Sequence, residues 1–495
     1  MGLAVIALPC VLYAMDLTVL NLAVPQLSAD LRPSSAELLW IVDIYGFVLA
    51  GMLIPMGTLG DRIGRRRLLL IGAAAFGAAS VLAAFSRSAG MLIAARAVLG
   101  VAGATLAPST LSLIRNMFSD AHQRSLAVGV WVTSYSVGGA LGPLVGGVLL
   151  DRFWWGSVFL VGVPVMLLLL VVGPVLLPEF RDPNARRLDL LSAAQSLIAV
   201  LLVIYGLKQI AQGNVDRWAT LAIASGIFTG ALFVRRQRRL TDPLIDLGLF
   251  RVRAFRVALG SYALATFAAF GIFLFISQYL QLVRGLTPLQ AGVCMLPIFA
   301  SFIVGSMFTP MLARRISARA LMGAGLGVAA VGFAILAASQ VTSGLGLFVT
   351  ACIAYALGLA PVFTLATDTI VGAAPPERAG AASALSETGS ELGGALGIAV
   401  LGSIGTAVYR GGMAHAVLNG VPHAAGAVAR ATIGGAVAVA QRLPATVGAE
   451  LVGAAREVFT RSLQVTSGVS AIVVVATAVA VVVALRNMPR AIAED

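Results

Sequence analysis

The chain has 495 residues, of which 59% are hydrophobic and only 11% charged, and its mean hydropathy is +0.96. A soluble protein of this length needs many more charged side chains to cover its surface. Apolar stretches of about 20 residues, enough to cross a hydrocarbon core of about 30 Å, recur along the chain and predict an all-α polytopic membrane protein. The net charge of +13 is divided among loops, with no basic run interleaved with aromatic residues, and this excludes nucleic acid as a partner.

Apolar runs between charged, Gly and Pro residues predict fourteen transmembrane helices, with an error of a few residues at each end. Most of the 34 Lys and Arg residues then fall in alternate loops, which resist translocation. We therefore expect a multi-pass protein of the cell (inner) membrane with both termini cytoplasmic. The predicted helices cover residues 3–25, 38–59, 68–86, 91–113, 125–150, 156–177, 190–210, 218–234, 257–282, 289–312, 320–339, 345–369, 379–405 and 463–485.

Residues 406–462 do not fit this alternation, because they carry several arginines on the outer side. They hold two Ala/Val-rich pieces, about 424–441 and 445–461, that are broken near Pro444. We interpret the segment as an extracellular helical hairpin. An additional membrane hairpin is the alternative, but it would place costly ionisable side chains in lipid, namely Arg430, Glu450, Arg456 and Glu457.

An internal repeat links two helices that lie about half a chain apart. Residues 123–142 and 377–397 share an opening Arg and a closing Gly-Gly-Ala-Leu-Gly sequence. Two parallel halves built around a midplane site are a transporter architecture. We therefore predict an N-terminal six-helix bundle, an inserted helix pair and a C-terminal six-helix bundle that contains the outer hairpin, over residues 1–177, 190–234 and 257–485.

Two sequence motifs consist of closely spaced glycines with charged residues or proline. In the loop after the second helix, glycines allow a tight turn and Asp61 can accept hydrogen bonds from arginines or from a helix N-terminus; a positively charged cytoplasmic loop with no further role is the alternative. In the fifth helix, glycines four residues apart permit close helix packing and proline bends the helix. The conformational residues of the two motifs are Gly57, Asp61, Arg62, Gly64, Arg65 and Arg66, and Gly138, Gly142, Pro143, Gly146 and Gly147.

Ionisable residues inside predicted spans are costly in lipid, and this makes them candidates for proton coupling or substrate binding. Glu387 and Glu391 replace Thr133 and Ser136 of the first repeat copy, and their spacing puts them on one helix face. The other candidates are Asp16, Asp43, Arg96 and Asp368. Structural alternatives remain open: helix-to-helix hydrogen bonds for Asp16, an ion pair for Arg96, the outer vestibule for Asp43 and a solvated helix end for Asp368.

Aromatic side chains could hold a flat cation through cation–π attraction, worth about 0.5–2 kcal/mol each. Several lie in the predicted spans, and most of them should be ordinary packing or lipid contacts. Trp131 and Tyr135, one turn apart on the fifth helix, are the candidates that we single out for substrate binding.

Together these motifs resemble the major facilitator superfamily, and within it the fourteen-helix drug:proton antiporters of the QacA-type multidrug efflux pumps. The resemblance covers essentially the whole chain. Asp16-Leu17-Thr18-Val19-x-Asn21 is similar to a motif of the drug antiporters, Arg96 with Gly100 and Gly103 to the helix-4 motif, and the fifth-helix glycines to a motif typical of exporters. The resemblance implies proton-coupled export of lipophilic cations such as quaternary ammonium compounds and dyes. The chain departs from the QacA-type pumps at one place. Such pumps can carry an acidic residue after the Leu-Pro pair of helix 10, but no acid follows Leu296-Pro297 here, and the resemblance therefore does not extend to divalent cations as substrates.

Several activities are not supported by the sequence. It contains no P-loop and no convergent set of catalytic residues, and Cys10, Cys294 and Cys352 lack metal-ligand spacing. We expect no enzyme activity, no metal and no cofactor, with protons as the coupling ion. The expected partners are small lipophilic cations, protons and membrane lipids, and we expect a monomer. Export of a lipid or other amphiphilic metabolite, proton-coupled uptake of a small metabolite, and a membrane sensor remain as alternative functions.

Overall fold

The computed structural model describes residues 2–117, 121–179, 181, 189–211, 217–240, 248–372, 379–416 and 421–484. Throughout these ranges every regular element is a helix, as expected of a chain whose backbone groups must be satisfied without water. The helices form two compact units. Unit 1 comprises Met1–Gly206, Arg217–Leu244 and Thr287–Gly292, and unit 2 comprises Leu207–Asp216, Ile245–Leu286 and Val293–Asp495.

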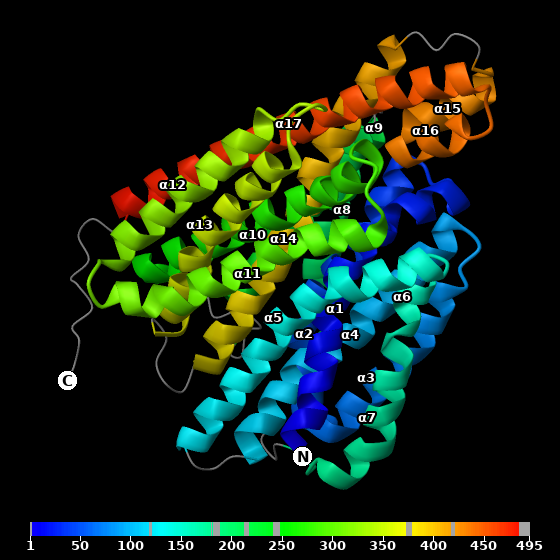
Figure 1. The fold of residues 1–495 in the computed structure, drawn as a ribbon. Coiled ribbons are helices and arrows are strands. Elements are labelled where there is room, and N and C mark those ends of the chain that lie inside the picture. Colours follow the sequence, from blue (N-terminus) through cyan, green and yellow to red (C-terminus); the bar gives the residue numbers. More distant parts are fainter. Residues whose placement is uncertain are drawn as a thin grey trace. The chain divides into compact units, whose positions relative to one another are not determined.

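Unit 1 contains the first nine helices, except for the last residues of α8, together with the first turn of α11. Helix α5 packs along α1, α2 packs along α4, and α3 packs between α4 and α7 (Figure 1). Their bounds are α1 Gly2–Leu31, α2 Ser35–Ile63, α3 Arg65–Ala84, α4 Ala89–Met117, α5 Ala121–Arg152, α6 Ser157–Leu160, α7 Gly162–Leu176, α8 Leu190–Ala211 and α9 Arg217–Gln237.

Unit 2 repeats part of this packing pattern. Helix α14 packs along α10, and α12 packs between α13 and α17 (Figure 1). The helix α10 ends in a single π-helical turn, η2. The bounds are η1 Leu249–Arg251, α10 Arg253–Gln278, η2 Tyr279–Val283, α11 Pro288–Ala313, α12 Ala318–Ala337, α13 Leu345–Gly372, α14 Ala379–His415, α15 His423–Ala431, α16 Ile433–Ala440 and α17 Ala445–Ala484.

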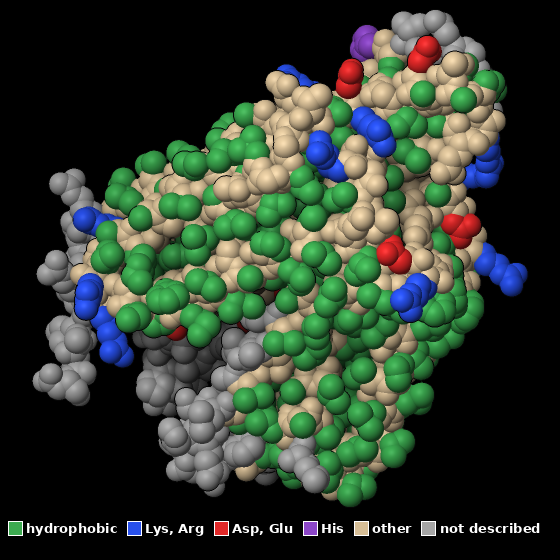
Figure 2. All heavy atoms as spheres, in the orientation of Figure 1, with side chains coloured by type: hydrophobic (Ala, Val, Ile, Leu, Met, Phe, Trp, Pro, Cys, Tyr) green, Lys and Arg blue, Asp and Glu red, His purple; other side chains and the backbone are tan. Residues whose placement is uncertain are grey.

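Most of the long helices are suited to a membrane. Within the described ranges, eleven are long and apolar enough to cross one, or twelve if the bent α1 counts as one span. Hydrophobic side chains cover most of the described surface in Figure 2, and charged side chains are few on this face. Helical residues fill most of each predicted range, and 156–177 is divided into α6 and α7. The number fourteen stays a prediction because not every helix reaches this apolarity over its described residues.

The repeated Gly-Gly-Ala-Leu-Gly sequence lies at equivalent helix contacts in the two units. In unit 1, a Cβ atom at Gly138 would collide with the Val11 carbonyl of α1, and one at Gly142 would collide with the Thr18 hydroxyl. In unit 2, a Cβ at Gly393 or at Gly397 would collide with backbone atoms of α10. The absence of side chains therefore lets α5 and α14 each approach a partner helix closely.

The segment that we predicted to be a hairpin contains the extended ends of two long helices and two short helices between them. Helix α14 extends to His415, and α17 runs without interruption from Ala445 to Ala484. Between them, α15 and α16 are separated at Thr432, whose hydroxyl caps α16 by accepting from the Gly435 amide at 3.0 Å. The predicted break near Pro444 is present, whereas the piece 424–441 is two short helices. The side of the membrane on which they lie remains a prediction.

The inserted pair, α8 and α9, is joined by an ion pair at one end. Arg236 donates from Nη2 to Asp189 Oδ1 at 3.0 Å and from Nε to Oδ2 at 3.2 Å. Partial burial disfavours the ionised carboxylate, but the hydrogen bonds from Arg236 and Ser192 outweigh it, so the pKa of Asp189 lies below its usual value. A Cβ at Gly226 of α9 would lie 2.8 Å from the Ala199 carbonyl oxygen, which shows how closely the two helices pack.

The turn between α2 and α3 depends on Gly64. This residue has φ +111°, in the region that favours glycine, and a Cβ there would lie 2.6 Å from Glu179 Oε1. The Glu179 carboxylate accepts from the backbone amides of Arg66 at 3.0 Å and Arg67 at 3.1 Å, at the N-terminus of α3. Glycine therefore supplies both the backbone conformation and the space for a carboxylate that caps a helix.

Replacing Gly64 with alanine should destabilise this turn by about 1–3 kcal/mol, because the backbone becomes strained and the Glu179 carboxylate must move. We expect a lower midpoint of thermal unfolding for the purified protein in detergent. Gly90→Ala is the control, since no atom lies within 4 Å of a Cβ at Gly90. Equal midpoints for the two variants would contradict this account of the turn.

Candidate functional site

A buried ion pair joins α1 and α4 in unit 1. Arg96 donates from Nη1 to Asp16 Oδ2 at 2.7 Å, and the two side chains are only 2% and 8% exposed. Helix α4 places Arg96 there, and both residues are among the predicted candidates. The short charge-assisted hydrogen bond fixes the Asp16 carboxylate inside unit 1. It matches the structural alternatives given above, a hydrogen bond between helices for Asp16 and an ion pair for Arg96.

The Arg96 guanidinium is also held by helix α2. Its Nε donates to the Ile41 carbonyl at 3.2 Å, and it stacks over the Tyr45 ring, 4.6 Å from the centroid. Asp43, on the same helix, is 1% exposed. Arg96 of α4 therefore contacts both α1 and α2. A change in the protonation of Asp16 would alter the contacts of all three helices.

The two aromatic candidates of α5 lie in a small cluster with residues of α1 and α4. Trp131 donates from Nε1 to the Thr110 hydroxyl at 3.0 Å and meets Tyr135 edge to face at 4.7 Å. Tyr135 meets Tyr13 at 5.4 Å. Trp131 is 9% exposed, so its ring is largely occupied by protein contacts, whereas Tyr135 is half-buried. Of the pair, Tyr135 is the better placed to contact a ligand.

The glutamates of α14 lie on a different face from its contact with α10. At about 100° per residue, Glu387 and Glu391 are roughly 160° around the helix from the glycines two positions later, Gly389 and Gly393. Those glycines face α10, where a Cβ at Gly389 would lie 2.8 Å from the Leu259 side chain. Glu387 is exposed on unit 2 and Glu391 is half-buried. An exposed carboxylate within a span is far less costly beside water than beside acyl chains.

Three aromatic side chains that we did not single out lie in the same unit. Phe363 of α13 meets Tyr262 of α10 at 5.1 Å and Phe302 of α11 at 5.2 Å, both edge to face. Tyr262 lies within hydrogen-bonding reach of Ser390 and within electrostatic range of Glu387 and Glu391. These three residues are far apart in the sequence, and only the packing of three helices brings them together. Unit 2 therefore combines carboxylates with aromatic rings, a combination suited to organic cations.

The remaining predicted residues are placed as follows. Asp368 is exposed near the end of α13. In the α2–α3 motif, Arg65 is buried and donates to the Pro108 carbonyl at 3.3 Å, and Arg66 donates to the Pro174 and Leu177 carbonyls at 3.0 Å. Arg62 is exposed, and the side chain of Asp61 lies outside the described part. Gly57, Pro143, Gly146 and Gly147 all lie within α2 or α5, where Pro143, Gly146 and Gly147 are buried.

Comparison with known proteins agrees with this architecture. The family model described as Major Facilitator Superfamily matches residues 6–398. The chain belongs to the major facilitator superfamily. It is 45% identical over 486 residues to the multidrug efflux pump LfrA of Mycolicibacterium smegmatis, covering 98% of this chain and 96% of that protein. It is 37% identical over 462 residues to the methyl viologen resistance protein SmvA of Salmonella typhimurium, covering 92% of each.

Solved structures show the same fold. A bacterial homologue of the human lysosomal transporter Spinster, in an inward-facing and unoccupied conformation, matches with a TM-score of 0.68 and 18% identity over 98% of this chain and 96% of that one. The predicted fold class, an all-α polytopic protein with the major facilitator fold, is thereby confirmed. The chain is a multi-pass membrane protein. Its family consists of transporters of small molecules and not of enzymes.

Proposed function

We propose that this superfamily member is a proton-coupled antiporter that exports lipophilic cations, such as quaternary ammonium compounds and dyes, across the inner membrane. The distribution of Lys and Arg in short loops supports a cytoplasmic location for both termini in this proposal. Support for efflux comes from the relatives named as efflux or resistance proteins. Support for cations comes from one arrangement above all: the two glutamates of α14 lie within electrostatic range of Tyr262, whose ring packs on Phe363 and, through it, on Phe302.

In this proposal, Glu387 and Glu391 bind either protons or a cation. The two carboxylates share one helix face, so the first negative charge disfavours the second unless a cation compensates for it. A lipophilic cation that enters from the cytoplasm or the inner leaflet favours their ionised forms, and the aromatic rings contact its flat surface. Protons from outside then neutralise the glutamates and release the cation. Each pH unit supplies about 1.4 kcal/mol per proton, and 100 mV adds about 2.3 kcal/mol per charge.

The role that we propose for Asp16 differs from the one predicted from sequence, because we no longer expect it to contact the substrate. Its carboxylate is already paired with Arg96 at 2.7 Å, so a cation would have to compete with a buried guanidinium for it. We therefore propose that Asp16 and Arg96 respond together to a change of protonation, while Glu387 and Glu391 contact the substrate. Asp43 and Asp368 are secondary proton sites in this proposal.

Efflux of ethidium from proteoliposomes with an imposed pH gradient tests the function. We expect transport that requires the gradient and stops when a protonophore collapses it. Accumulation in the direction of proton entry would instead indicate an uptake symporter. Gradient-independent handling of ethidium together with gradient-driven movement of a fluorescent lipid would favour export of a lipid or other amphiphile.

Replacing Phe363 with alanine should weaken cation binding, because Phe363 is the central ring of the aromatic group. Loss of one cation–π contact of about 0.5–2 kcal/mol corresponds to a rise in KM of about 2- to 30-fold for ethidium efflux. Phe308→Ala is the matched control, since Phe308 lies on α11 and is 54% exposed. An unchanged KM in the Phe363 variant would exclude this ring from the substrate site.

A further inference from the structure

An open cavity of about 490 Å³ lies in unit 2, and neither the glutamates of α14 nor the aromatic group line it. Its walls come from the end of α10, where Gln281 and Leu282 belong to the π-helical turn η2, and from α16 and α17. The volume is in the range of small-molecule sites, and isolated π-helical turns are frequent at functional sites. The walls of α16 and α17 consist mostly of small apolar side chains, such as Val437, Ala440 and Ala449.

One cation, Arg456 of α17, lines this cavity. Its Nε donates to the Leu282 carbonyl of η2 at 2.9 Å, and among the described residues the guanidinium group has no other hydrogen bond and no ion pair. A guanidinium has five N–H donors, so four remain for a ligand or water. A fixed guanidinium in an apolar cavity repels cationic drugs and favours an anion, and phosphate is the anion whose geometry it matches well.

The depth of the cavity indicates where such an anion comes from. The candidate span that contains α10 ends at Val283, within two residues of the lining residues Gln281 and Leu282. The end of a span lies near the lipid head groups, since the apolar helix has there crossed the hydrocarbon core. Basic pockets between helices bind anionic head groups at the cytoplasmic surface. The same pairing of guanidinium and phosphate applies at the outer surface, where we predict this segment to lie. A free phosphate would make no use of the apolar walls.

We propose that this cavity binds one anionic phospholipid, whose phosphate contacts Arg456 and whose glycerol and upper acyl groups contact Val437, Ala440 and Ala449. Gln281 and Gln441 supply further polar groups for the head group. The inference does not depend on the proposed export of cations. It assigns an anionic ligand, in addition to the proposed cationic substrates, to a separate site beside Arg456.

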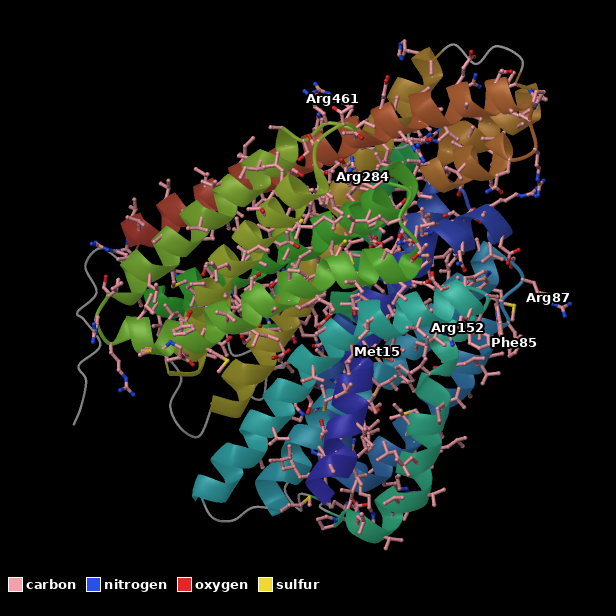
Figure 3. All side chains as sticks on the ribbon, in the orientation of Figure 1. Met15, Phe85, Arg87, Arg152, Arg284 and Arg461 are labelled. Carbon is pink, nitrogen blue, oxygen red and sulfur yellow. The ribbon has the colours of Figure 1, made fainter. Side chains whose placement is uncertain are left out.

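Native mass spectrometry of the full-length protein tests this proposal with phosphatidylglycerol as the probe and phosphatidylcholine with the same chains as the neutral comparison. We expect wild type to retain one phosphatidylglycerol in preference, and Arg456→Gln to bind it at least fivefold more weakly. Arg461→Gln, an exposed arginine on the same helix (Figure 3), is the matched control. Ala449→Phe should block the cavity while keeping the charge, and also tests the proposal if Arg456→Gln fails to fold.

Three results would overturn the proposal. Equal retention of phosphatidylglycerol by wild type, Arg456→Gln and Ala449→Phe would show that lipid binds elsewhere. Displacement of the bound lipid by inorganic phosphate or glycerol phosphate at low concentration would identify a soluble anion as the ligand. Competition by ethidium would show that the cavity belongs to the cation pathway.

Discussion

Replacing Glu387 with glutamine should reduce pH-driven ethidium efflux to the rate measured without a gradient. Glutamine keeps the size and the hydrogen-bonding capacity of the side chain but cannot exchange a proton, so the cycle loses the step that couples it to the gradient. Glu387 is exposed, and its carboxylate has no hydrogen bond or ion pair among the residues that the structure describes, so we expect the thermal stability of the variant to match that of wild type. Efflux and the unfolding midpoint are measured on the same preparation.

Glu457→Gln is the matched control for this experiment, because Glu457 is an exposed glutamate of α17 outside the proposed transport site. Its efflux should equal that of wild type. Undiminished gradient-driven efflux in Glu387→Gln and in the double variant with Glu391→Gln would remove the proton-coupling role from α14. Loss in the double variant alone would mean that either glutamate suffices.

Removing one member of the Asp16–Arg96 pair should destabilise the protein severely. Arg96→Gln leaves the Asp16 carboxylate buried without its cation, and breaking a buried pair in this way costs about 3–5 kcal/mol. Asp16→Asn leaves the cation without its anion and should have a similar effect. The double variant, which places a neutral amide opposite a neutral amide, should recover part of the loss because no uncompensated charge remains. Unfolding midpoints in detergent measure all three.

The control for this set is Arg87→Gln, which removes an exposed arginine in the loop between α3 and α4 (Figure 3). Surface charges contribute little, so its midpoint should stay within the error of wild type. If the loss of stability in the double variant equals the sum of the losses in the two single variants, the coupling energy is zero and the ion pair contributes nothing of its own.

The spans and the repeat could be predicted because hydrophobicity and glycine spacing are local in sequence. An apolar run of about 20 residues can cross a membrane only in a structure that satisfies its own backbone hydrogen bonds, such as a helix. The repeated glycines lie at helix contacts where a Cβ would collide with the neighbouring helix, namely Gly138, Gly142, Gly393 and Gly397. Asp16 and Arg96 could be singled out for the same reason, since each is an ionisable residue in an apolar run.

What could not be predicted depends on contacts between helices. Nothing in the sequence pairs Asp16 with Arg96, 80 residues away, and nothing groups Tyr262, Phe302 and Phe363, because aromatic residues are also ordinary packing residues in spans. The division of 424–441 at Thr432 was missed for a different reason. Ala- and Val-rich sequence gives no sign of a break, and the threonine acts only through a cap that three-dimensional structure makes visible.

The uninterrupted helix α17 mechanically connects the lipid-binding cavity to the membrane-spanning part of unit 2. Its 40 residues rise by about 1.5 Å each, to a length about twice the thickness of the hydrocarbon core. A rod without a hinge transmits any tilt of one end to the other. A spectroscopic label attached at the start of α17 should therefore report movements of the transmembrane portion, and occupation of the cavity beside Arg456 should in turn restrict those movements.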